Sequence, residues 1–126
     1  MTTKPIDCLM INGVQRRVRR WVETVFDNQI GDVKLRAARF LEEAAEAAQA
    51  AGLHRDDADL VLTQVYGRPP GRLVQEIGGA MTTLCALASA ANIDLAGATL
   101  DEMARMETPE IIEKVRRRQS EKVTPR

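Results

Sequence analysis

Three glutamates within five residues are the first candidates for chemistry in this chain of 126 residues. Glu42, Glu43 and Glu46 stand in the stretch FLEEAAEAAQA, which predicts a helix. Residues three and four apart share one face of a helix, so the three carboxylates form an acidic strip. Carboxylate oxygens are ligands that suit Mg²⁺. The strip is either a magnesium site or a solvated acidic face, with its charge offset by arginines one turn earlier.

A fourth acid, Glu76, stands near the start of the stretch VQEIGGAMTTLCALASAAN. This stretch predicts an apolar helix in which Cys85 is the only ionisable side chain between Glu76 and Asp94. The acid either has a partner or a metal, or is an exposed first-turn residue that the helix dipole favours. Gly78 and Gly79 follow, although glycine inside a helix costs about 1 kcal/mol relative to alanine. The cost indicates that the pair serves the close approach of another group.

The elements that must position these acids are all predicted to be helices, because no stretch shows strand-like alternation. Asp32 is a predicted N-cap, Gly52 a predicted C-cap, and Thr108 a predicted N-cap before Pro109. Apolar residues recur at helical spacing over residues 11–26, 33–51, 56–66 and 73–91, over a short stretch at 95–106, and in a last helix from Pro109. These helices and their short loops indicate an all-α helical bundle of four to five helices, with the second and fourth packed antiparallel.

The chain is predicted to form a single domain over residues 1–126, with a loose N-terminal segment (1–10) and a charged tail (about 119–126). Its 18 basic and 18 acidic residues give no net charge, which argues against a nucleic acid polymer or a membrane as partner. We see no signal peptide and no uninterrupted apolar run of the roughly 18 residues that a bilayer requires. Cys8 and Cys85 lack metal-type spacing, so we expect a reducing, cytoplasmic compartment and a buried Cys85 thiol.

The stretch EEAAE, followed by QEIGGAMTTLCALASAANIDL, resembles the MazG-like nucleoside triphosphate pyrophosphohydrolases of the all-α NTP pyrophosphatase group. The family pattern is E-E-x-x-E, a linker, then E-x-x-D and an apolar helix. The likeness covers roughly residues 21–94, and the linker of 29 residues between Glu46 and Glu76 is long for the family. Gly79 stands where the family has its aspartate, so one expected metal ligand is missing.

The resemblance implies Mg²⁺-dependent hydrolysis of an NTP or dNTP to the monophosphate and pyrophosphate. It implies that Glu43, Glu46 and Glu76 bind Mg²⁺. It also implies that Glu42 orients or deprotonates the attacking water.

Further positions match the family's substrate contacts. The candidates are Lys114, Arg117 and Arg118 for the phosphates, and Trp21 for stacking on the base. The basic run is alternatively a solvated last helix favoured by its dipole. Trp21 is alternatively a core residue, because it fits the apolar stripe of the first helix.

Three interpretations of Gly79 stay open. Mg²⁺ binds through three carboxylates and water, the glycines admit a backbone or a nucleotide, or catalysis is lost and a nucleotide- or partner-binding helical module remains. The family also implies a homo-oligomer, a dimer or a tetramer, and alanine-rich helix faces favour association. In such an assembly Asp94 of a second subunit becomes a further candidate ligand.

Overall fold

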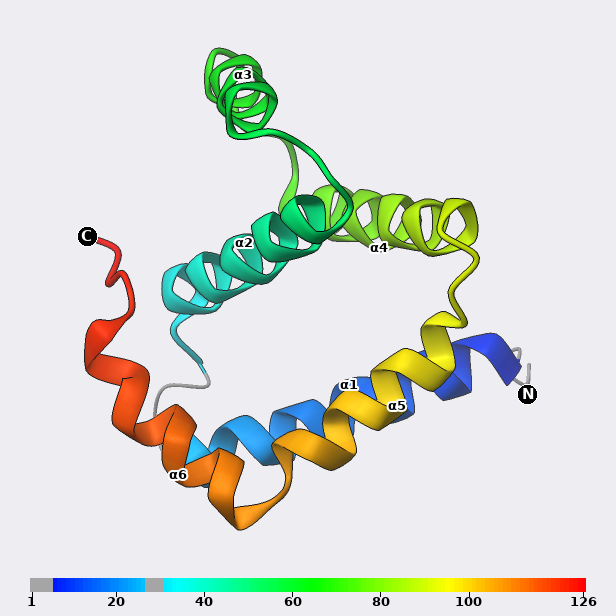
Figure 1. Ribbon diagram of the computed structural model, residues 1–126, viewed down its shortest axis with the longest axis vertical. Helices are drawn as coiled ribbons and strands as arrows, with labels where there is room; N and C mark the ends of the chain where they lie inside the picture. The colour runs from blue at the N-terminus through cyan, green and yellow to red at the C-terminus, as the bar shows by residue number, and fades with distance from the viewer. Residues whose placement is uncertain (1–5, 27–30) are drawn as a thin grey trace. The chain divides into compact units, whose positions relative to one another are not determined.

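Six α-helices and a short 3₁₀ helix form the described part of the chain, residues 6–26 and 31–126, in the computed structural model (Figure 1). They are α1 (Ile6–Phe26), α2 (Val33–Ala50), α3 (Arg55–Tyr66), α4 (Leu73–Ala90), α5 (Leu95–Met106), α6 (Pro109–Arg118) and η2 (Gln119–Glu121). The all-α prediction is confirmed, and no strand occurs within these two ranges. The predicted number of four to five helices is wrong. The short stretch at 95–106 and the last helix from Pro109 each form a helix of their own, α5 and α6, which brings the number to six.

The ends of the helices follow residues that control backbone geometry. The backbone N–H of Leu35 donates to Oδ1 of Asp32 at 3.0 Å, which confirms Asp32 as the N-cap of α2. Gly52 ends α2 with a φ of 94°, a left-handed conformation typical of a C-terminal cap. Asn92 ends α4 in the same way with a φ of 57°, which the sequence did not lead us to expect. Thr108 occupies the N-cap position of α6 without a side-chain capping bond.

The predicted boundaries of α2, α3, α4 and α5 lie within one residue of those observed. By contrast, α1 begins at Ile6, five residues before the predicted start, so helix extends into the N-terminal segment that we expected to be loose. Residues 1–5 of that segment lie outside the described residues. The same holds for residues 27–30 of the predicted break after α1.

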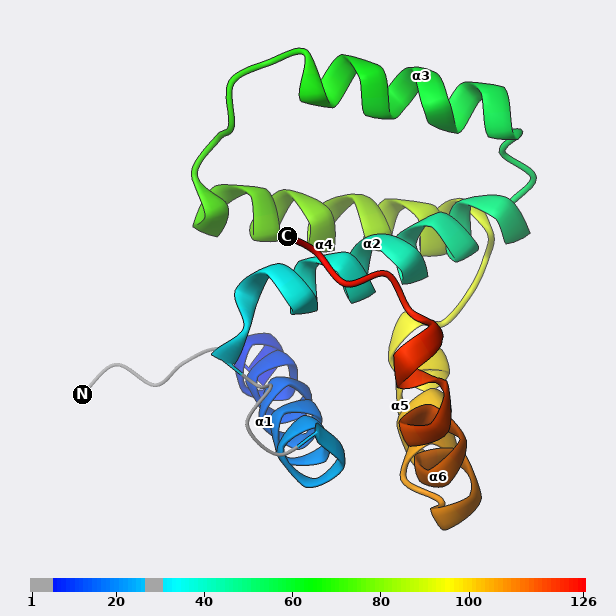
Figure 2. The ribbon, with the colours of Figure 1, turned by 90° about the vertical axis from the view of Figure 1, so that its left-hand side faces the viewer.

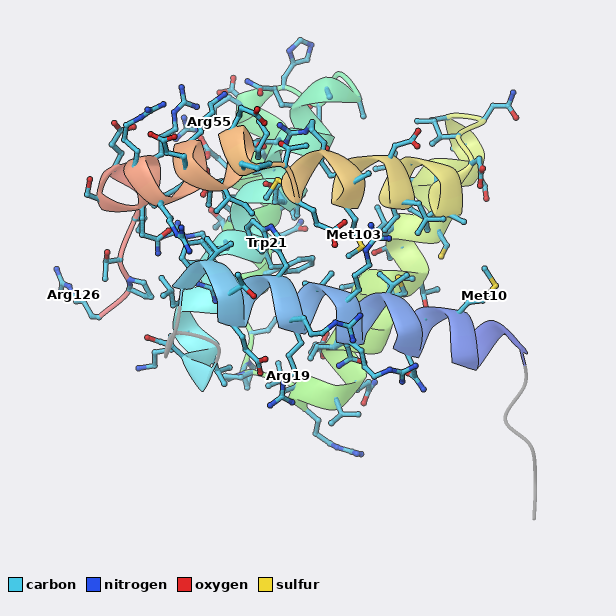
Figure 3. All side chains as sticks on the ribbon, turned by 90° about the horizontal axis from the view of Figure 1, so that it is seen from below. Met10, Arg19, Trp21, Arg55, Met103 and Arg126 are labelled. Carbon is cyan, nitrogen blue, oxygen red and sulfur yellow. The ribbon has the colours of Figure 1, made fainter. Side chains whose placement is uncertain are left out.

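The chain divides into two compact units. The terminal unit combines residues 1–40 with 102–126, and the central unit is the continuous stretch 41–101. The terminal unit contains the larger buried set of apolar side chains: Val22, Val25, Leu35 and Met103. In Figure 3, Trp21 projects from α1 and Met103 from α5 into the space between these helices. The terminal unit is discontinuous in sequence, because it combines two stretches that are separated by the central unit.

Polar bonds to the backbone fasten the C-terminal part of the terminal unit to α1. Arg116 of α6 donates from Nη2 to the carbonyl of Thr24 at 3.0 Å and from Nε to that of Val25 at 3.2 Å. These carbonyls lie in the last turn of α1, where no intrahelical partner is available. Trp21 Nε1 donates to the carbonyl of Met106 at 2.7 Å. One cation and one indole thus satisfy backbone groups that a helix end leaves open.

The central unit leaves most of its apolar side chains exposed. Its helices α3 and α4 run in roughly opposite directions, joined by the loop at residues 67–72 (Figure 2). Ala88 is the only buried residue of these two helices. The exposed large apolar side chains of the pair are Leu60, Val61, Leu62, Val65, Tyr66, Leu73, Val74, Ile77, Met81, Leu84 and Leu87.

The expected packing of α4 against α2 does not cover the apolar stripe of α4 within one copy. The prediction of a buried Cys85 thiol is accordingly wrong, because Cys85 is exposed. The helical spacing of the apolar residues predicts that α4 packs against another group, but this spacing does not identify that group.

By length and composition, α4 is the one described helix that is long and apolar enough to cross a membrane. Its 18 residues have a mean hydropathy of 1.2. This is weak evidence for a membrane span, because core helices of soluble proteins have the same length and composition.

The N-cap of α2 provides a test of the fold. Replacing Asp32 by alanine removes the acceptor for the Leu35 N–H, and we expect the free energy of unfolding to fall by about 1 kcal/mol in urea denaturation. Asp32→Asn is the matched control, since asparagine caps helices about as well as aspartate. Equal losses in the two variants would show that capping is not what Asp32 contributes.

Candidate functional site

The acidic strip lies in the central unit, on the C-terminal part of α2. Glu43 and Glu46 are exposed, and Glu42 is half-buried. They lie on one continuous helix, so the one-face arrangement predicted from their spacing is preserved. The strip therefore faces solvent over most of its length and is accessible to a cation.

Glu76, in the first turn of α4, also belongs to the central unit and is exposed. Its carboxylate folds back over Gly71, where any Cβ would collide with the Glu76 side chain. Gly71 thus leaves room for the flexible end of the Glu76 side chain. This contact was not predicted from the sequence.

Within residues 10–26 and 31–126, no three histidine, cysteine, aspartate or glutamate side chains come together as a metal site. The donor chemistry of Glu43, Glu46 and Glu76 fits Mg²⁺, a hard cation that prefers carboxylate oxygens and keeps several waters. Their geometry in one copy does not complete the set, because Glu76 does not join the strip on α2. A three-carboxylate site requires α4 to move toward α2 or a carboxylate from another molecule.

The two glycines of α4 face open space. A Cβ built on Gly78 or on Gly79 would meet nothing within 4 Å. The central unit therefore does not make the close approach that we inferred from the pair. Thr82 and Thr83 donate from their hydroxyls to the carbonyls of Gly78 and Gly79 at 2.9 and 3.1 Å, bonds that stay within the helix.

The three predicted phosphate contacts share one exposed face of α6. Lys114, Arg117 and Arg118 are all exposed, and their spacing of three and four residues places them side by side on the helix. Arg116, between them in sequence, is turned away and bonded to the end of α1. The basic run thus separates into one structural arginine and three solvent-facing cations in the terminal unit.

Trp21 lines a pocket of about 280 Å³ in the terminal unit. Its ring packs edge-on against Phe26, with 5.7 Å between the ring centroids, and its N–H is bonded to Met106. These contacts agree with the core interpretation of Trp21. The pocket gives the residue a second environment, whose other lining residues are Arg17, Arg20, Thr24, Glu107 and Ile112.

An ion pair between Arg17 and Glu107 forms part of the pocket wall. Arg17 donates from Nε and Nη2 to the two carboxylate oxygens at 3.0 and 2.5 Å. The hydrogen bond from Arg17, and then the charges of Arg17 and Arg20, lower the pKa of Glu107 below its ordinary value. Sequence reasoning missed the pair, because its members lie 90 residues apart and only the fold brings them together.

A second arginine environment lies at the start of α2. The guanidinium of Arg36 lies 5.2 Å from the centroid of the Phe26 ring. Its Nε and Nη2 are buried without a hydrogen-bond partner in the described structure. Burial, and then the neighbouring charge of Arg39, lower the pKa of Arg36. Arg36 is thus a cation with unused donors in the basic half of the molecule.

Although the net charge of the chain is zero, its two units have formal charges of opposite sign. The terminal unit has 15 lysines and arginines against 9 aspartates and glutamates, a formal charge of +6. The central unit has 3 basic against 9 acidic residues, a formal charge of −6. The predicted cation ligands all lie in the acidic unit, and the predicted phosphate contacts all lie in the basic one.

Comparison with protein-family models, with curated proteins and with solved structures finds no match for this chain. The likeness to the MazG-like family therefore rests on its motif residues, chiefly the strip on α2 and Glu76.

The ion pair between Arg17 and Glu107 predicts that the stability of the protein depends on pH. Because the pKa of Glu107 is lowered on folding, the pair stabilises the protein above the pKa of glutamate in the unfolded chain. This contribution is lost as the pH falls through the lower pKa of the folded state.

We expect Glu107→Gln to lower the urea midpoint at neutral pH, with the difference from wild type shrinking on acidification. Glu110→Gln, also in an exposed position, is the control. A difference that stays constant down to acid pH would contradict the assignment.

Proposed function

We propose that this protein is a Mg²⁺-dependent nucleotide pyrophosphohydrolase that cleaves an NTP or dNTP to the monophosphate and pyrophosphate. The observation that carries the proposal is that all four motif glutamates belong to one acidic unit, on two of its helices. The formal charge of −6 on this unit attracts cations, and the exposed face of the strip gives them access. The motif pattern of the MazG-like family adds the reaction type.

Each residue has a role in this proposal. Glu43, Glu46 and Glu76 would hold Mg²⁺, which when bound would neutralise phosphate oxygens and polarise the phosphorus under attack. Glu42 would accept a proton from the water that attacks the α-phosphorus, and pyrophosphate would leave. The substrate would be held by Lys114, Arg117 and Arg118 at its phosphates and by Trp21 at its base.

The pocket beside Trp21 supports a ligand-binding role for this tryptophan. The indole has a fixed orientation because its N–H is bonded, and Arg20 adds a cation to a pocket wall in which Arg17 is paired with Glu107. We further propose a cytoplasmic homo-oligomer, a dimer or a tetramer, with no nucleic acid polymer and no membrane as partner.

The second candidate function is a non-catalytic module that binds a nucleotide or a partner chain. Gly79, in the position of the family aspartate, favours it, together with the absence of a completed three-carboxylate group in the described structure. The two candidates differ in whether the glycine is a functional feature or marks a lost ligand.

Titration of Mg²⁺ into the purified protein, alone and with a non-hydrolysable NTP analogue, tests the metal site. We expect binding that tightens with the nucleotide and that weakens by about 100-fold in Glu43→Gln/Glu46→Gln, which removes two of three carboxylate ligands. Glu110→Gln, an exposed glutamate of α6, is the control and should bind as wild type does. Binding that survives loss of both glutamates would exclude this site.

Gly79→Asp separates the two candidate functions. The added side chain has room, because a Cβ at this position meets nothing within 4 Å. If the proposal holds, the natural protein already releases pyrophosphate from one of the common NTPs or dNTPs, and the variant does not increase the rate. Activity that arises only in Gly79→Asp would instead identify the natural protein as the non-catalytic module.

A further inference from the structure

We infer that the pocket beside Trp21 binds the nucleoside 5′-monophosphate part of a nucleotide without Mg²⁺, and that Arg20 is the contact for its phosphate. This assignment rests on the proposed function, from which it takes the class of ligand. It adds a specific contact for the phosphate that is nearest to the sugar. Its test measures ligand binding in the absence of metal, whereas the proposed function is tested by Mg²⁺ binding and release of pyrophosphate. Either can therefore fail without the other.

The pocket lies wholly within the terminal unit, so all of its walls belong to one compact unit. Four lining residues follow one another on α1 within two turns and share one side of that helix, and two come from residues 107–112. In chain order the lining residues are Arg17, Arg20, Trp21, Thr24, Glu107 and Ile112. The volume of about 280 Å³ lies just below the roughly 300–1,000 Å³ of ligand pockets, which suits one ring system better than a whole triphosphate.

Trp21 gives the pocket an aromatic wall with a fixed orientation. Its Nε1 donates to the carbonyl of Met106 at 2.7 Å, and its ring packs edge-on against Phe26. Figure 3 shows Trp21 projecting from α1 toward the space between α1 and α5. The half-buried side chain of Ile112 adds apolar surface to the wall. A planar ring suits these walls, because aromatic rings pack well on one another in offset or edge-on arrangements.

Arg20 is the cation of the pocket wall that is left for a ligand. Arg17 uses Nε and Nη2 on the two carboxylate oxygens of Glu107, so its paired donors are occupied. No group of residues 10–26 and 31–126 forms a hydrogen bond or an ion pair with the exposed guanidinium of Arg20. A guanidinium beside an aromatic wall matches a ring that is linked to a phosphate, because paired N–H donors bind phosphate oxygens in a defined geometry.

Thr24 adds a hydrogen-bond acceptor to the same wall. Its hydroxyl donates to the backbone carbonyl of Arg20 at 2.8 Å, which leaves the lone pairs of the hydroxyl oxygen for a donor from the ligand. Glu107 adds a second acceptor, and its charge is offset by Arg17. The hydroxyl and amino groups of a nucleoside are donors of the kind that these oxygens accept.

The three exposed cations of α6 do not line this pocket. They lie about 140–240° around the helix axis from Ile112, which does line it. These cations are Lys114, Arg117 and Arg118. A phosphate that is joined through one sugar to a ring in the pocket therefore meets Arg20 before it meets a cation of α6. This phosphate is the α-phosphate of a nucleotide, the one that the monophosphate keeps.

The pocket and the proposed metal ligands belong to different units. Glu42, Glu43, Glu46 and Glu76 all lie in the central unit, whereas every lining residue of the pocket lies in the terminal unit. The contacts assigned to the monophosphate are a ring, a guanidinium and two acceptor oxygens, none of which requires a metal ion. We therefore expect the monophosphate to bind in the presence of EDTA.

Calorimetric titration of the whole protein in EDTA measures this binding, and the fluorescence of Trp21 locates it, since Trp21 is the only tryptophan. The ligands are the 5′-monophosphates of adenosine, cytidine, guanosine and uridine, each compared with its nucleoside and with inorganic phosphate. We expect at least one monophosphate to bind and to change the Trp21 emission. Its dissociation constant should be lower than that of its nucleoside by about tenfold or more, because the nucleoside lacks the charge-assisted hydrogen bonds to Arg20.

Arg20→Gln should raise the dissociation constant of that monophosphate by about tenfold or more and leave that of the nucleoside unchanged. Arg19→Gln is the matched control, because it removes the same charge from the neighbouring position of α1. Arg19 bonds to Glu23 at 2.9 Å and does not line the pocket, so this variant should bind both ligands as wild type does.

The inference is overturned if no monophosphate binds in EDTA, or if binding leaves the Trp21 emission unchanged. It is equally overturned if the nucleoside or inorganic phosphate binds as tightly as the monophosphate, or if Arg20→Gln and Arg19→Gln weaken binding equally. The comparison of monophosphate with nucleoside on wild type decides the matter even if Arg20→Gln does not fold. Binding of the monophosphate by a protein that neither binds Mg²⁺ nor releases pyrophosphate would keep this site and remove the proposed reaction.

Discussion

Contact with water is unfavourable for the apolar helix α4, and the environment of the rest of the central unit depends on how this helix is covered. The helix has apolar or small side chains on nearly all sides, and only Ala88 is buried. Its single acid, Glu76, lies in the first turn, folded over Gly71. A group that covers α4 would therefore also determine the surroundings of the Glu76 carboxylate, so the apolar contact and the candidate metal chemistry are physically linked in this unit.

The terminal unit follows a different physical logic, in which polar groups at helix ends hold elements together. Arg116 satisfies carbonyls of α1, and Trp21 satisfies the carbonyl of Met106 at the end of α5. Since an unpaired backbone group near the core costs about as much as a lost hydrogen bond, these side chains have structural work that other cations of α6 do not. The solvent-facing cations of that helix remain available for anions.

Local features of this fold were readable from the sequence, and distant pairings were not. Asp32 and Gly52 mark the ends of α2 because capping depends on a few adjacent residues. The strip on α2 was predictable for the same reason, since helical spacing alone places its carboxylates on one face. The pairing of Arg17 with Glu107 depends on tertiary structure. The wrong prediction for Cys85 shows that an apolar period indicates burial without indicating whether the same chain provides it.

The discontinuous terminal unit has a consequence for synthesis on the ribosome. The central unit is complete once residue 101 has emerged, whereas the terminal unit still lacks residues 102–126. At about 5–20 residues per second this interval lasts roughly 1–5 s. During it the acidic unit, with its exposed α4, is present while α1 has neither Met103 nor Arg116 to pack against. The nascent chain therefore passes through a stage at which its apolar helix is finished before its own basic half has formed.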